Sequence, residues 1–121
     1  PITIYGDGKQ VRDVLFIDDL VSLYDQAYQN IDVIAGKIFN IGGGPLHTLS
    51  LHELLAQLEL LKGAKIPIRY DNWRPGDQKV YISNIDAAEK VFGWKPRITV
   101  IEGIENLYDW ILRNKSLFKK I

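Results

Sequence analysis

Apolar residues near the start of the chain form two runs that read as strands. Residues 2–5 and 10–17 are rich in β-branched and aromatic side chains, and Gly6-Asp7-Gly8-Lys9 separates them. An Asp-Gly pair between two such runs favours a tight turn, so the sequence predicts an antiparallel hairpin. Shorter apolar runs predict further strands over 37–41, 67–70 and 80–82.

Apolar residues at helical spacing predict the helices, and capping residues predict where they begin. The first helix should start behind Asp18 or Asp19 as its N-cap and end near Asn30. Ser50-x-x-Glu53 and Thr99-x-x-Glu102 are two capping boxes. The boxes predict two more helices, one ending near Gly63 and the other closing the chain with a buried apolar face, formed by Ile101, Ile104, Leu107, Tyr108, Ile111 and Leu112. A brief helix should cover 86–91 and be closed by Gly93, and the basic end over 115–120 should fray.

These elements predict a mixed α/β lobe, residues 1–121, with short strands and at least three helices. The strands are too short and scattered to build a large sheet by themselves. The chain has no methionine and opens on a strand-like run. We therefore expect a fragment that packs against a partner domain outside this sequence.

The composition argues against some classes of function but identifies none. The 121 residues are 46% hydrophobic and 25% charged, as in ordinary globular proteins. Lys+Arg and Asp+Glu both number 15, so the net charge predicts no nucleic-acid or membrane partner. There is no cysteine, and no apolar run approaches the roughly 20 residues that span a bilayer. A cytoplasmic location is the resulting expectation.

Two arginines are the strongest candidates for ligand binding. Arg12 interrupts an apolar strand, on the face that also carries Val14, while Asp13 lies on the opposite face; Arg74 lies in a polar loop. The planar fork of a guanidinium matches phosphate oxygens, so arginines from two segments can clamp a pyrophosphate. Arg12 has an equally weighted structural alternative, an internal ion pair with Asp13, Asp18 or Asp77. The residues alone leave both interpretations open.

Several familiar motifs fail on inspection. Gly42-Gly43-Gly44 is followed by Pro45 and a loop, whereas a dinucleotide-binding loop opens directly into a helix. Tyr5-x-x-x-Lys9 spans the Asp-Gly turn, so its side chains do not share a helix face. His47 and His52 have no partners at metal-ligand spacing, which predicts no metal site. No residue is therefore assigned a catalytic role.

Seven segments in sequence order resemble the C-terminal part of NAD-dependent nucleotide-sugar epimerases and dehydratases, which are extended short-chain dehydrogenase/reductases. The segments are YGDGKQVRD (5–13), IDDL (17–20), FNIGG (39–43), SLHEL (50–54), RPGDQ (74–78), GWKP (93–96) and YDW (108–110). Within the family, the residues of these motifs most resemble those of the members that epimerise a CDP-sugar at C2. The implied fold is the substrate-binding lobe of a Rossmann-type enzyme.

The resemblance also implies a role for six residues. Arg12 and Arg74 would hold the diphosphate, Thr3 and Tyr5 would line the base, Asn40 would contact substrate, and Asp77 would lie near the ribose. The family keeps its NAD loop and its Tyr-x-x-x-Lys in an N-terminal Rossmann domain that is absent here. The resemblance therefore implies NAD bound by that domain, a homo-oligomeric parent enzyme, and no catalysis by this chain alone.

Two alternatives stay open. In the first, the parent is a 4,6-dehydratase or 4-epimerase that acts on dTDP- or UDP-sugars and has the same fold. In a different class, the chain is a non-catalytic relative used for regulation or protein binding, and its arginines are structural.

Overall fold

A computed structural model describes residues 1–118 of the chain. The strands are β1 (Ile2–Tyr5), β2 (Val11–Asp13), β3 (Thr48–Ser50), β4 (Ile68–Asp71) and β5 (Val80–Tyr81). The α-helices are α1 (Ile17–Gln29), α2 (Ile31–Ile34), α3 (Leu51–Lys62), α4 (Asp86–Phe92) and α5 (Val100–Arg113), and a 3-10 helix, η1, covers Lys115–Phe118. The mixed α/β class predicted from the sequence is confirmed.

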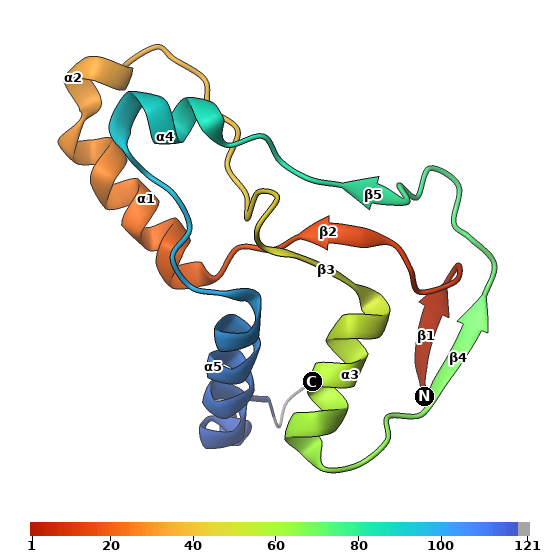
Figure 1. Cartoon of the computed structure of the whole chain (residues 1–121). Coiled ribbons are helices and arrows are strands. Elements are labelled where there is room, and N and C mark those ends of the chain that lie inside the picture. The colour runs from red at the N-terminus through yellow and green to blue at the C-terminus, as the bar shows by residue number, and fades with distance from the viewer. Residues whose placement is uncertain (119–121) are drawn as a thin grey trace.

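The strands form two small separate sheets. β1 pairs in parallel with β4, so that Ile4 lies opposite Tyr70. β2 is the central strand of the second sheet, antiparallel to β3 and parallel to β5. In Figure 1 the β1–β4 pair lies at one end of the molecule, and α1, α2 and α4 gather at the other.

The predicted hairpin is wrong. The chain does turn over Gly6 to Gly8, with φ of 87° and 76° at the two glycines, but the flanking strands do not pair with each other. The ladder between β1 and β4 continues past β1, where Gly6 N–H donates to Asp71 O. In the other sheet, Val11 N–H at the start of β2 donates to Lys79 O. One edge of β1 is thus taken by β4, and both edges of β2 are taken, by β3 and β5.

Both capping boxes are confirmed. The Ser50 hydroxyl accepts from the Glu53 N–H at 3.2 Å, and the Glu53 carboxylate accepts from the Ser50 N–H at 2.6 Å. Thr99 and Glu102 repeat this exchange at the start of α5. Each box satisfies backbone donors that a helix N-terminus otherwise leaves without partners, an effect worth about 1 kcal/mol. The predicted ends at Asn30, Gly63 and Gly93 are also confirmed.

The predicted cap of α1 is wrong. The N-cap is Phe16, with no side-chain hydrogen bond, and the helix begins at Ile17. The buried Asp19 carboxylate instead accepts from the backbone N–H groups of Arg97 and Ile98, at 3.1 and 2.9 Å. Asp19 thereby ties the first turn of α1 to the segment before α5.

The segment predicted as a strand over 37–41 forms none. Ile38 is 95% exposed and Phe39 is half-buried, and no strand within residues 1–118 pairs with the segment. Strand structure needs a hydrogen-bonded partner, and none of the described strands supplies one. The β-forming sequence alone was therefore insufficient.

The core is small and lies between α1 and α4. Leu23, Ala88 and Trp94 are buried, and partly buried apolar residues surround them, namely Leu15, Leu20, Phe39, Ile41 and Phe92. The Trp94 indole N–H donates to Asp19 O at 3.1 Å, which satisfies the one polar atom of a side chain only 1% exposed. Trp94 is the largest fully buried side chain among the described residues, and burial of a large aromatic ring stabilises a core strongly.

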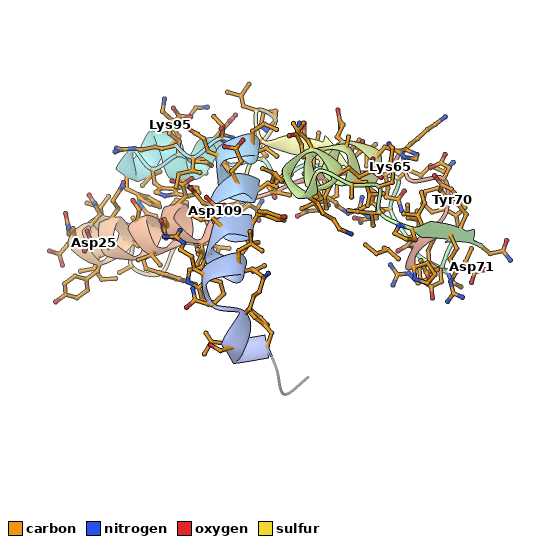
Figure 2. All side chains as sticks on the ribbon, turned by 90° about the horizontal axis from the view of Figure 1, so that it is seen from below. Asp25, Lys65, Tyr70, Asp71, Lys95 and Asp109 are labelled. Carbon is orange, nitrogen blue, oxygen red and sulfur yellow. The ribbon has the colours of Figure 1, made fainter. Side chains whose placement is uncertain are left out.

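The predicted burial of the α5 apolar face is wrong in large part. Ile101, Leu107, Ile111 and Leu112 remain 39–53% exposed. Figure 2 shows why: α5, labelled at Asp109, extends away from the rest of the lobe, which runs from Asp25 to Tyr70 in this view. Beyond it, 115–118 forms the η1 turn where fraying was expected, and 119–120 lie outside the described residues. None of the described helices has the length and apolarity to cross a membrane.

Candidate functional site

A hollow of about 320 Å³ brings together the two arginines that the sequence singled out. Arg12 enters it from β2 and Arg74 from the loop between β4 and β5. The other lining residues come from the same region and from β3 and α3, namely Gln10, Val14, Leu49, Ser50, Leu51, Leu54 and Asp77. We call this hollow the arginine cleft.

Arg12 reaches the cleft because side chains alternate along β2. Its Nη1 donates to the backbone carbonyl of Val11 at 2.9 Å, and it forms no ion pair with a carboxylate within residues 1–118. The alternative pairing with Asp13, Asp18 or Asp77 is therefore not what the structure shows. Most of the donors of this guanidinium are available to an anionic ligand.

Arg74 is oriented by two neighbours. Its Nε lies 3.3 Å from Asp77 Oδ2, three residues along the loop, and its Cζ lies 4.8 Å from the centroid of the Tyr5 ring. The Arg74 side chain is 65% exposed, so its pairing with Asp77 is weak and screened by solvent. Tyr5 and Asp77 orient the guanidinium, and its two terminal nitrogens have no partner among residues 1–118.

Asp13 faces away from the cleft and holds the glycine loop. Its Oδ2 accepts from the Gly44 N–H at 3.0 Å, and Ser83 also donates to it. Burial raises the pKa of Asp13, but the hydrogen bonds from Gly44 and Ser83 outweigh burial, so the pKa lies below its ordinary value. The two adjacent charges of β2 thus have separate roles: Arg12 lines the cleft, and Asp13 stabilises the fold.

Thr3 and Asn40 do not line the arginine cleft. Thr3 shares a face of β1 with Tyr5, but its hydroxyl accepts from Arg69 Nε at 2.7 Å. Asn40 is exposed and lies in a different shallow hollow with Asn84, Asp86 and Lys90. Of the six predicted binding residues, the structure places Arg12, Arg74 and Asp77 on the cleft and Tyr5 against Arg74.

Sequence reasoning missed Gln10, which lines the cleft, and His52, which lies near it. Gln10 Nε2 donates to Tyr5 O at 2.8 Å, while its buried Oε1 has no partner among residues 1–118. His52, for which the sequence predicted no metal-binding partner, contacts the Gly6 to Gly8 turn. No local pattern predicts either contact, because each depends on how β1, β2 and α3 meet.

The triple-glycine loop does not fit a dinucleotide. A Cβ on Gly42 would meet Asp13 and Ser83, one on Gly43 would meet the backbone of Val14, and one on Gly44 would meet Ile85. These close approaches are to protein atoms, so the glycines serve packing. Residues 1–118 also contain no group of three His, Cys, Asp or Glu residues arranged to hold a metal ion.

Comparison with known proteins decides the family. The family model for GDP-mannose 4,6-dehydratase matches residues 1–107, which is most of the chain. The chain belongs to this family. The fold is that of the extended short-chain dehydrogenase/reductases, as the resemblance of the sequence motifs implied.

Curated relatives in the family include enzymes of different specificity. The chain is 41% identical over 112 residues to CDP-paratose 2-epimerase of Salmonella typhi, which covers 91% of this chain and 32% of the relative. It is 34% identical over 121 residues to UDP-glucuronate 4-epimerase of Thermodesulfobacterium geofontis, covering all of this chain and 36% of the relative. The chain thus spans about a third of the length of these relatives.

A solved relative has the same arrangement of elements. It is the UDP-glucuronic acid 4-epimerase of Bacillus cereus in complex with UDP-glucuronic acid and NAD, with a TM-score of 0.84 and 30% sequence identity. The match covers 93% of this chain and 35% of the solved one. The similarity therefore extends over nearly all of the fold described above.

Proposed function

We propose that residues 1–121 bind the nucleoside diphosphate part of a nucleotide-sugar, as the C-terminal lobe of a longer epimerase of the CDP-paratose 2-epimerase type. The observation that carries the proposal is that Arg12 and Arg74, from segments about sixty residues apart in sequence, line one hollow. Two guanidinium groups in one cleft offer the charge and donor geometry that a pyrophosphate requires. Asp77 and Tyr5, which hold Arg74, complete the site.

The choice of a CDP-sugar epimerase rests on similarity. The identity to CDP-paratose 2-epimerase is higher than that to the UDP-glucuronate 4-epimerase, at 41% against 34%. Arg12 and Arg74 recognise phosphate, which all nucleotide-sugars share, and so they favour no particular base. The runner-up is therefore a lobe of a UDP- or dTDP-sugar 4-epimerase or 4,6-dehydratase.

Exposed apolar surface supports the proposal of a longer parent. On α1, the residues Ile17, Val21, Tyr24 and Tyr28 are 58–79% exposed and share one face. An apolar groove of about 210 Å³ lies between α5 and α3, beside the arginine cleft. Exposed apolar surfaces of this kind are normally covered.

The glycine loop is packed against protein atoms and so leaves no room for a dinucleotide between them. We infer that the parent binds NAD outside residues 1–121 and that this chain alone does not catalyse. The role left to the described residues is to hold the diphosphate, which fixes where the sugar lies. Fixing the substrate in this way lowers the entropic part of the barrier to reaction.

The test is a titration of the full-length protein with CDP, UDP and dTDP. CDP should bind most tightly, and Arg74→Ala should weaken its binding by roughly 1 to 3 kcal/mol. The midpoint of thermal unfolding should change little, since Arg74 is largely exposed. The matched control is Arg113→Ala on α5, which removes an exposed arginine far along the chain from the cleft.

The outcomes separate the alternatives. A preference for UDP or dTDP would support the proposed binding of a nucleoside diphosphate and contradict the proposed specificity for CDP. Loss of stability in Arg74→Ala without any defect in nucleotide binding would support the non-catalytic class, in which the arginines are structural. Failure of the unmodified protein to bind any of the three nucleotides would remove the basis for an epimerase.

A further inference from the structure

The Gly6 to Gly8 turn is the direct covalent link between the two halves of the arginine cleft. Tyr5, which stacks on Arg74, ends β1, and Arg12 belongs to β2. These strands lie in different sheets and share no ladder, so no backbone pairing fixes their separation. The conformation of the turn must therefore contribute to how far Tyr5 lies from Arg12.

His52 contacts this turn through both its backbone and its ring. Its N–H donates to Gly8 O at 3.1 Å, and its Nε2 lies 2.7 Å from Asp7 O. The ring also packs close to Gly8, where an added Cβ would come within 2.7 Å of Nε2. The turn is thus joined to the second residue of α3 by two hydrogen bonds and a close packing contact.

The chemistry of the ring contact fixes which nitrogen carries the proton. Asp7 O is a carbonyl and can only accept, so Nε2 must donate. Both the imidazolium and the neutral ring protonated at Nε2 satisfy this requirement. The contact therefore survives either charge state, as a structural tether should.

The tether connects the turn to the sheet that holds Arg12. His52 follows Leu51, the first residue of α3, and β3 ends at Ser50 immediately before it. β3 pairs with β2 so that Leu49 lies opposite Arg12. A movement of the turn relative to His52 is therefore also a movement of Tyr5 relative to Arg12.

We propose that His52 is a positioning residue of the arginine cleft, which holds the Gly6 to Gly8 turn and so keeps Tyr5 and Arg74 at a fixed separation from Arg12. The inference rests on the proposed function, because positioning matters only if the two arginines share a ligand. It adds a residue outside the cleft lining that tunes the affinity for the diphosphate. Pre-organisation of this kind raises affinity by removing the need to order the site on binding.

The experiment compares His52→Ala, His52→Gln and Lys62→Ala in the full-length protein. CDP and UDP are the probes, and amide exchange over 5–10 reports on the turn. His52→Ala should weaken binding of the better nucleotide about tenfold, with faster exchange in the turn. His52→Gln should restore most of the affinity, because the glutamine amide can donate from nearly the position of Nε2. Lys62→Ala, an exposed residue of the same helix, should change neither quantity.

Each result decides between the two proposals. If the unmodified protein binds neither nucleotide, the proposed function and the role of His52 both fail. If it binds and His52→Ala binds equally well, only the role of His52 is wrong. Equal weakening in His52→Ala and His52→Gln would likewise overturn the role, because the hydrogen bond would then contribute nothing.

Discussion

The carboxylate of Asp13 accepts a hydrogen bond from the backbone N–H of Gly44, thirty-one residues further along the chain. Ser83 donates to the same carboxylate. One side chain therefore joins β2 to the glycine loop and to the segment after β5. On the other face of β2, Arg12 lines the cleft, so the site depends on how firmly this strand is held.

Asp13→Asn should destabilise the fold. The amide retains the size of the side chain but loses the charge, and one of its two terminal groups can no longer accept from Gly44 or Ser83. Because hydrogen bonds to a charged group contribute more than neutral ones, we expect a loss of about 1 to 3 kcal/mol in the free energy of unfolding by urea. Asp32→Asn, at an exposed position in α2, is the control and should stay within about 0.5 kcal/mol.

The contribution of Asp13 should depend on pH in a defined direction. Its pKa is lowered in the folded state, so its stabilisation is complete above the unfolded value of about 3.9 and disappears as the pH falls through the lower folded value. The stability difference between the unmodified protein and Asp13→Asn should therefore be full at neutral pH and shrink toward pH 3. Urea titrations at both pH values measure it, and an undiminished difference at pH 3 would contradict this account.

Tyr5 should affect binding through Arg74. Its ring lies under the guanidinium at 4.8 Å, a stacking contact worth roughly 0.5 to 1 kcal/mol at a partly exposed site. Tyr5→Leu should lower the affinity for a nucleoside diphosphate about two- to fivefold by calorimetry, because Arg74 loses its orientation. Tyr5→Phe keeps the ring and should bind normally; a defect of equal size in Tyr5→Phe would show that the hydroxyl matters instead.

Gly43→Ala and Gly103→Ala should differ sharply in stability. A Cβ on Gly43 would overlap the backbone carbonyl of Val14, and a backbone atom cannot shift as cheaply as the end of a side chain, so a loss of about 3 kcal/mol is expected. A Cβ on Gly103, inside α5, would meet the Phe16 side chain at 3.2 Å, and alanine favours helix by about 1 kcal/mol. Gly103→Ala should therefore be nearly neutral in thermal unfolding. A nearly neutral Gly43→Ala would mean that the glycine loop can shift.

The candidate site was only partly predictable. The guanidinium chemistry of Arg12 and Arg74 and the resemblance of the motifs around them predicted a diphosphate ligand from the sequence. The packing of distant segments decided the rest. It places Asn40 in another hollow, Gln10 on the cleft and His52 against the Gly6 to Gly8 turn. The six predicted roles remain proposals, to be decided by the binding measurements above.

Interactions within a few residues were determined by the sequence itself. The boxes at Ser50 and Thr99 and the glycine ends at Gly63 and Gly93 were predictable because each donor and acceptor lies within one helical turn of the other. Strand pairing was decided only by the tertiary structure. The two runs on either side of the Gly6 to Gly8 turn could form a hairpin locally, yet β1 pairs with β4 and β2 pairs with β5. Strand pairing depends on which distant segments lie alongside, and no local pattern determines that.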